Sequence, residues 1–95
     1  MNHRPNLPKV LIPFNLAEAV TVPEAAKLVG RSAVTVRTWC SLYDLGRRVA
    51  GQWWVSRVAL AMFLDSDRDA LRAYLSGDRA SELVASYFDR CGVAR

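Results

Sequence analysis

The sequence predicts a mainly α-helical fold with one small β-hairpin, in which a helix-turn-helix is followed by C-terminal helices. Between residues 21 and 91, apolar residues recur at helical spacing, and capping residues and glycines bound each stretch. In residues 46–55 the pattern changes to the alternation typical of strands. With 95 residues, 52% of them apolar, we expect one small core. We divide the chain into an extended arm (1–15), a compact domain (16–65) and C-terminal helices (66–95) that pack on this domain or mediate self-association.

The N-terminal arm carries three of the four prolines, Pro5, Pro8 and Pro13. Prolines at this density exclude a helix and favour an extended chain. The inner part of the arm is too apolar to stay in water, so we expect it to lie on its own subunit or on a neighbouring one. We assign this stretch to self-association. Its residues are Val10, Leu11, Ile12 and Phe14.

Start and stop signals of a short helix coincide in residues 21–30. Thr21 and Glu24 have the spacing of a capping box, Pro23 falls in the first turn, and Gly30 can end the helix. These signals predict a helix of about two turns.

A second helix is predicted directly after this turn, capped by Ser32 and running to about Leu42. Two short helices joined by a turn that contains glycine, the second with a polar and basic outer face, are the signature of a helix-turn-helix. The periodicity assigns Val36, Trp39, Cys40 and Tyr43 to the inner arc, and Val34, Arg37, Thr38 and Ser41 to the outer arc.

Residues 46–55 predict a β-hairpin with Ala50 and Gly51 as a two-residue turn. We expect the outward Trp54 to be covered, by the C-terminal helices, by another subunit or by DNA. The alternation assigns Val49, Trp53 and Val55 to one face and Arg48, Gln52 and Trp54 to the other.

The remaining helices follow from caps and glycines. Ser56 can cap a third helix over residues 57–64, whose seven successive apolar residues leave it no face for solvent. Gly77 then divides the rest of the chain into two amphipathic helices, at about residues 67–76 and 79–91.

Charge is unevenly distributed along the chain. Residues 1–60 hold eight Lys or Arg against three Asp or Glu, a net charge of +5, whereas residues 61–95 hold five against six. Such a basic first part suits a polyanionic partner, and a nearly neutral second part suits packing or protein contacts.

Several kinds of function have no support in the sequence. Cys40 and Cys91 have neither the spacing of metal ligands nor that of a disulfide framework, and we expect both to be free thiols. His3 lies in the proline-rich arm, where nothing can orient it for catalysis. The longest apolar run, Val58 to Leu64, is too short to cross a bilayer. We expect no catalysis, metal or cofactor, and a cytoplasmic location without membrane contact.

Three stretches together carry a resemblance to a known family: TVPEAAKLVGRSAVTVRTW (21–39), RVAGQWWVS (48–56) and RVALAMFL (57–64). Within these 44 contiguous residues, helix-turn-helix, hairpin and capped apolar helix follow in the order and spacing of the excisionase-like winged-helix family of the MerR-like superfamily. The chain thus resembles this family over nearly half its length. The resemblance implies a winged helix-turn-helix at residues 16–65 and binding to double-stranded DNA.

The same resemblance implies roles for individual residues. The second helix would enter the major groove, where Arg37 suits a guanine edge and Val34 a thymine methyl. The hairpin would lie on the adjacent minor groove or backbone. Members often begin the second helix with a basic pair, but Ala33 and Val34 stand there in this chain, so we expect modest affinity for each subunit. The expected DNA-binding residues are Arg31, Ser32, Val34, Thr35, Arg37, Thr38, Ser41, Arg47, Arg48, Gln52 and Arg57.

The function that the resemblance implies is that of an excisionase, also called a recombination directionality factor. Such a factor, encoded by a bacterium or phage and associated with the nucleoid, binds and bends attachment-site DNA and promotes excision by a tyrosine-type integrase. We expect self-association, head to tail along the DNA. Two alternatives remain: a small winged-helix transcriptional regulator, or a phage packaging adaptor such as a terminase small subunit.

Overall fold

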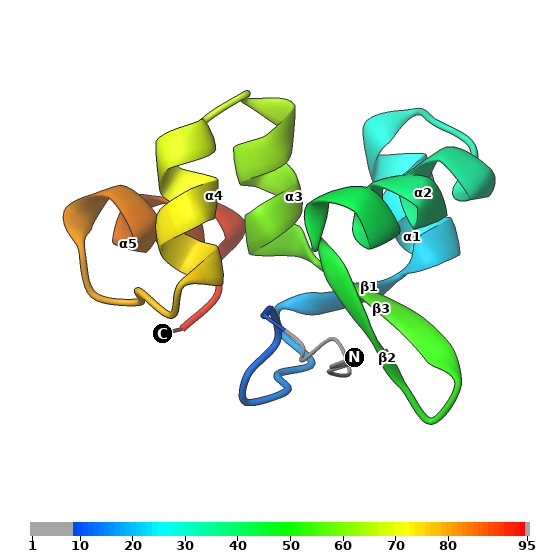
Figure 1. The fold of residues 1–95 in the computed structure, drawn as a ribbon, viewed down its shortest axis with the longest axis horizontal. Helices are drawn as coiled ribbons and strands as arrows, with labels where there is room; N and C mark the ends of the chain where they lie inside the picture. Colours follow the sequence, from blue (N-terminus) through cyan, green and yellow to red (C-terminus); the bar gives the residue numbers. More distant parts are fainter. Residues whose placement is uncertain (1–8, 95) are drawn as a thin grey trace, which may run out of the picture.

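The computed structural model describes residues 9–94 and shows a small α+β fold. Within these residues there are five helices and one antiparallel sheet of three strands, in the order β1-β3-β2 (Figure 1). The helices α1 and α2 lie beside the sheet at one end of the molecule, α4 and α5 form the other end, and α3 lies between them. The elements are β1 (Ala19–Thr21), α1 (Val22–Val29), α2 (Ala33–Tyr43), β2 (Gly46–Val49), β3 (Gln52–Ser56), α3 (Arg57–Leu64), α4 (Arg68–Leu75) and α5 (Glu82–Cys91).

Local signals set the ends of α1 as the sequence predicts. The Thr21 hydroxyl accepts a hydrogen bond from the Glu24 N–H at 3.3 Å, and the Glu24 carboxylate accepts one from the Thr21 N–H at 2.9 Å. Gly30 ends the helix in the left-handed conformation, with φ of 69°. The predicted caps Ser32 and Ser56 begin α2 and α3, and Asp67 caps α4 at the start of the predicted segment.

The last helix begins later than the sequence predicts, at Glu82 instead of Arg79. The Asp78 carboxylate accepts hydrogen bonds from the N–H groups of Ala80 and Ser81, at 2.9 and 3.0 Å. This side chain holds the segment in a turn, because an Asp that bonds to the backbone two or three residues ahead competes with the helix. Ser81 then provides the cap.

The strand β1 is absent from the sequence-based prediction. It pairs with β3, so that Val20 lies opposite Val55. Three residues are too few to show alternation, and the strand forms because β3, distant in the chain, offers it a partner. The sheet is thus a hairpin with one added strand.

The hairpin itself forms where predicted, but its faces differ from the prediction. In the observed register Val49 lies opposite Gln52, and Arg48 lies opposite Trp53. A two-residue turn pairs the residues on either side of it, so the alternation does not continue through the turn as the prediction assumed. Arg48 therefore shares a face with Trp53, and its guanidinium lies 6.0 Å from the centre of that ring.

The inner part of the arm belongs to the core of its own chain. Val10 and Leu11 are fully buried, which corrects the assignment of the whole apolar stretch to self-association. Phe14 lies edge-on against Trp54, with ring centres 5.6 Å apart, and covers the outward tryptophan. Ile12 and Phe14 keep 50% and 37% exposure, so their role in self-association stays a prediction.

A buried polar cluster joins the two ends of the molecule. The hydroxyls of Ser56 and Tyr74 both donate to the carboxylate of Glu18, which is only 4% exposed. Burial, reinforced by the charge of Glu18, raises the pKa of Tyr74, so its hydroxyl remains a donor at neutral pH. Glu18 precedes β1, Ser56 ends β3 and Tyr74 lies on α4, so this cluster fixes α4 against the sheet.

Candidate nucleic-acid interface

The predicted outer face of α2 is exposed. Val34 is 64% exposed, and Arg37, Thr38 and Ser41 are exposed as well, whereas Thr35 at the edge of this face is half-buried. On the opposite side, Val36 and Cys40 are buried in the core. The Gly30 to Ser32 turn fixes this orientation, because α2 packs on α1 through its inner arc.

The first turn of α2 is organised by its cap. Ser32 Oγ accepts a hydrogen bond from the Thr35 N–H at 3.1 Å and donates one to Thr35 Oγ1 at 3.0 Å. The Thr38 hydroxyl donates to the carbonyl of Val34 at 2.9 Å. The first N–H groups of a helix lack an acceptor within the helix, so this end is suited to an anion. Thr35 keeps a hydroxyl proton that it can donate to such an anion.

The arginines predicted to bind DNA fall into two groups. Arg31 and Arg37 are exposed, and their guanidinium groups make no hydrogen bond or ion pair with any residue in the range 9–94. Arg48, also exposed, makes a long hydrogen bond of 3.4 Å to the carbonyl of Gly51 and lies 6.0 Å from the centre of the Trp53 ring. These three side chains are available to a partner.

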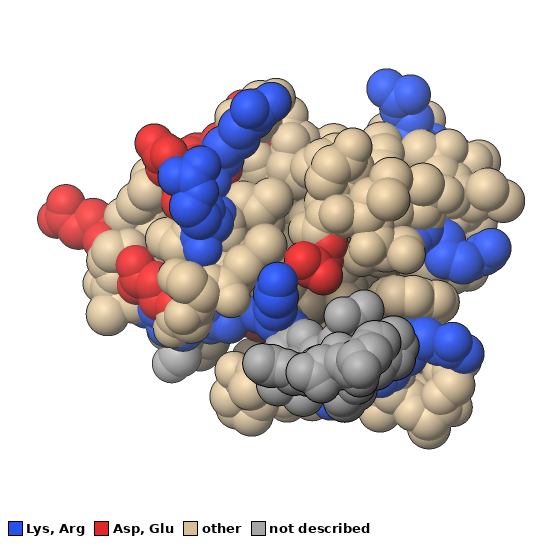
Figure 2. All heavy atoms as spheres, viewed as in Figure 1, with Lys and Arg blue, Asp and Glu red and all other residues tan. Residues whose placement is uncertain are grey.

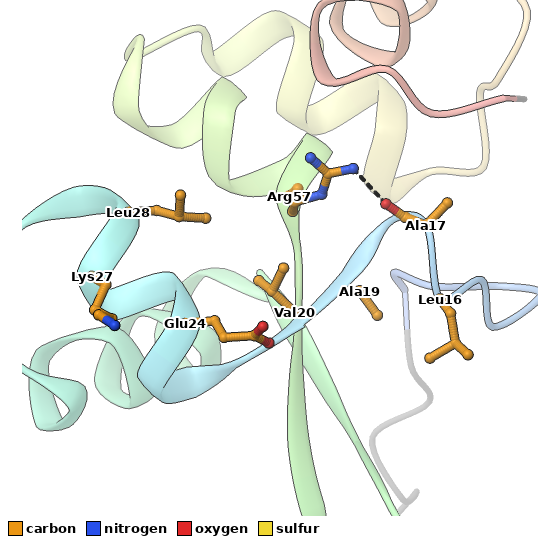
Figure 3. A pocket seen from close by; sticks show the side chains of 8 residues that line it. All are labelled: Leu16, Ala17, Ala19, Val20, Glu24, Lys27, Leu28 and Arg57. Atoms are coloured by element: carbon orange, nitrogen blue, oxygen red, sulfur yellow. Dashed lines mark hydrogen bonds between the residues drawn. The ribbon is translucent and has the colours of Figure 1, made fainter.

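Arg47 and Arg57 are already engaged within the chain. Arg47 donates to the carbonyl of Leu11 at 2.9 Å and thereby ties the arm to the hairpin. Arg57 donates to the carbonyl of Ala17 at 2.5 Å (Figure 3). The hollow around Arg57 has a volume of about 480 Å³ and is lined by α1, β1 and the segment before it, with no residue of α2. The structure therefore does not bring Arg57 together with the outer face of α2.

The hairpin tip carries the remaining predicted residues. Ala50 and Gly51 have φ of 51° and 81°, the two positive values of a type I′ turn, and this turn suits the twist of a hairpin. Gln52, at the tip, is exposed. Figure 1 shows the hairpin projecting from the body beside α2. In the observed register Arg48 shares one face of the hairpin with Trp53, and Gln52 shares the other face with Val49. The two side chains therefore leave the tip on opposite faces.

Acidic side chains are concentrated at one end of the molecule, whereas basic side chains occur at both ends. In Figure 2 the end of the molecule formed by α1, α2 and the hairpin shows Lys and Arg, whereas Asp and Glu are concentrated over α4 and α5, where they alternate with Lys and Arg. Between Arg31 and Arg57 the chain has five arginines and one acid, Asp44. The carboxylate of Asp44 lies 3.5 Å from Lys9 Nζ, which partly neutralises it.

Two features of this surface were missed by the sequence analysis. Leu42, at the end of α2, is 65% exposed beside the predicted face. A groove of about 590 Å³ separates α2 from α3 and α4, and Arg31 and Arg68 both line it. Periodicity indicates neither feature, because both depend on how α3 and α4 pack beside α2.

The described residues offer no site for a metal, since no group of three or more His, Cys, Asp or Glu side chains converges among them. His3 lies outside the described residues. Both cysteines are free thiols, and burial raises the pKa of Cys40 to about 11, so this thiol is not a nucleophile at neutral pH. Within residues 9–94, no helix has the length and apolar character needed to cross a membrane.

No family model, curated protein or solved structure matches the chain. Its function must therefore be argued from the exposed face of α2, the hairpin and their chemistry.

Proposed function

We propose that α1, α2 and the hairpin form a winged helix-turn-helix that binds double-stranded DNA. The observation that carries this proposal is the exposed outer face of α2, on which Arg37 has no partner among the described residues and the helix N-terminus is open to an anion. A face of this kind fits the major groove, which is wide enough for a helix. The hairpin then contacts the adjacent backbone or minor groove with its tip, from which Arg48 and Gln52 project on opposite faces.

Each side chain has a distinct task in this proposal. Arg37 pairs with the O6 and N7 atoms of a guanine, and Val34 contacts a thymine methyl. Arg31, Arg48, the hydroxyl side chains and the amides at the start of α2 bind phosphates, which fix position and carry no sequence information directly. Arg47 and Arg57 donate to the carbonyls of Leu11 and Ala17, so in this proposal they hold the arm and the segment before β1.

We infer that the biological role is that of an excisionase-type accessory factor, which binds and bends attachment-site DNA for a tyrosine-type integrase. The resemblance over residues 21–64 supports this role. Exposed Ile12 and Phe14 offer an apolar contact for self-association along the DNA.

A small transcriptional regulator of the same fold is the second candidate. Its support is the same α2 face, which would bind an operator equally well. The break between α4 and α5 at residues 76–81 argues against the long dimerisation helix of effector-sensing activators.

The deciding experiment combines footprinting at the attachment site with an excision assay that contains the cognate integrase. Protection of the site with stimulated excision supports the accessory factor. Promoter occupancy without any effect on excision supports the regulator. Binding to neither DNA would contradict the proposal. So would a binding constant that does not change with salt, since four or five neutralised phosphates require a log–log slope of about −3 to −5.

A further inference from the structure

The groove beside α2 combines two charged groups from distant parts of the chain with an apolar wall. Arg31 comes from the turn before α2, and Arg68 is the first residue of α4. Figure 2 shows Lys and Arg side chains at the upper edge of the molecule both over the α1–α2 end and over the α3–α4 end. The wall between them is formed mainly by Trp39, Tyr43, Met62, Phe63, Leu64 and Leu71.

Neither guanidinium is neutralised within the chain. The side chains of Arg31 and Arg68 make no hydrogen bond or ion pair with any described residue. The one carboxylate in the groove, that of Asp67, already accepts hydrogen bonds from the Ala70 N–H and the Tyr87 hydroxyl, each at 3.0 Å. The groove therefore presents two guanidinium groups without an ion-pair partner, together with the carboxylate of Asp67, above an apolar surface.

The aromatic side chains of the wall pack on one another and form a platform. The ring of Phe63 lies 4.9 Å from the rings of both Trp39 and Tyr43. Tyr43 remains 45% exposed, so the platform is open to a partner.

The groove is continuous with the proposed DNA surface. Arg31 belongs to both, and Trp39 lies one helical turn after Thr35, at the edge of the outer face of α2. A sugar–phosphate backbone has the matching chemistry, because its phosphates pair with guanidinium groups and its deoxyribose rings present carbon atoms.

We propose that Arg68, together with Arg31, binds the backbone of the duplex whose major groove holds α2. This inference rests on the proposed function and extends it, since it makes α4 part of the DNA-binding surface. We propose double-stranded DNA as the partner that occupies the groove. The experiment must distinguish it from an acidic peptide, which could bind the same arginines.

The test compares Arg68→Gln with Arg72→Gln in the full chain. Arg72 is one turn further along α4, is exposed, and lies 3.6 Å from its partner Asp69 outside the groove. Arg68→Gln should weaken binding about fivefold on specific and nonspecific duplexes alike, and make the salt slope shallower by about one. Arg72→Gln should stay within about twofold of the wild type. In a phosphate ethylation interference experiment, one or two phosphates whose ethylation blocks binding of the wild type should no longer matter for Arg68→Gln. The Arg72→Gln pattern should match that of the wild type.

Other outcomes are equally informative. If the two variants bind DNA with equal affinity, equal salt slope and the same interference pattern, the groove does not hold the backbone, although the proposed function stands. If Arg68→Gln binds DNA normally but loses binding to a peptide rich in Glu and Leu, the occupant is a protein. If the wild-type chain binds no duplex, both proposals fail. Circular dichroism checks folding, and Arg68→Lys should restore most of the salt slope.

Discussion

The arginines of the two ends of the molecule differ in what they contact. In the C-terminal helices, Arg90 lies 2.8 Å from Asp65, and Arg79 donates to the carbonyl of Tyr74 at 2.7 Å while its guanidinium lies 3.8 Å from the ring of Tyr74. On the α2 side, Arg31 and Arg37 have no partner in the described part of the chain. The same residue type thus stabilises the fold at one end and is left available at the other.

Three arginines depart from this division between the two ends of the molecule. Arg47 and Arg57 lie in the basic part of the sequence but bind carbonyls of the N-terminal segment. Arg68 lies in the nearly neutral part and has no described partner. Charge counts along the chain therefore indicate which end is basic, but only the contacts separate structural arginines from available ones.

The largest expected effect is a loss of stability from a substitution at Gly46, where the hairpin packs against α2. A Cβ on Gly46 would lie 2.4 Å from the carbonyl oxygen of Trp54 and 3.0 Å from Cys40 Sγ. Gly46→Ala should lower the free energy of unfolding by about 3 kcal/mol, because backbone and core must both move. Chemical denaturation measures this loss.

Gly30→Ala is the matched control for that substitution. Gly30 has φ of 69° and no atom within 4 Å of the added Cβ, so only backbone strain of about 1 kcal/mol is expected. Equal losses for the two variants would contradict the packing of the hairpin against α2.

The next effect concerns DNA discrimination and tests the comparison directly. Arg37→Ala should reduce the preference for the specific site by about 1–3 kcal/mol, since a bidentate contact to one base is lost. Arg48→Ala should weaken specific and nonspecific binding to a similar extent. Competition binding with specific and nonspecific duplexes measures both. If the two substitutions have the same effect on discrimination, Arg37 does not read a base.

Arg79, which contacts its own chain, should affect stability and leave DNA affinity unchanged. Arg79→Met keeps much of the volume but removes the hydrogen bonds to the carbonyls of Tyr74 and Asp78 and the contact of the guanidinium with the Tyr74 ring. Stability should therefore fall by about 1–2 kcal/mol. DNA affinity of the folded protein should be unchanged. A loss of affinity without a loss of stability would place Arg79 in the DNA interface and remove the distinction between the two ends.

The smallest expected effect is a pH dependence of the free energy of unfolding that arises from Asp65, which contacts the C-terminal helix α5. The hydrogen bond from Arg90, assisted by Tyr87, lowers the pKa of Asp65 below its usual value. A carboxyl whose pKa is lower in the folded state stabilises that state above about pH 4, and the contribution disappears as the pH falls further. Asp65→Asn should make the unfolding free energy less dependent on pH below 4. If Asp65→Asn has the same pH profile of unfolding free energy as the wild type, the contact between Asp65 and Arg90 does not contribute to stability.

Local signals account for most of what the sequence predicts correctly. The capping box of Thr21 and Glu24, the serine caps and the glycine at position 30 act within one helical turn, so they can be recognised without the fold. The outward orientation of Val34 and Arg37 also follows from periodicity alone.

Two errors are local: the hairpin faces depend on the two-residue turn, and the start of α5 depends on the Asp78 carboxylate. The other differences depend on contacts between distant segments. The strand β1 exists because β3 pairs with it, and Leu11 is buried because the arm folds back beside Tyr74 and Arg47. The groove lined by Arg31 and Arg68 also depends on contacts between distant segments, because residues of α2, α3 and α4 form it. No local pattern marks any of these contacts.

An NMR titration of the chain with a short duplex of the cognate site, at low salt, tests the central claim most directly. The account predicts that amide shifts concentrate at residues 31–41 and at the hairpin tip, with smaller shifts at the start of α4 and none in α5. Shifts concentrated in α5, or no shifts at all, would contradict it.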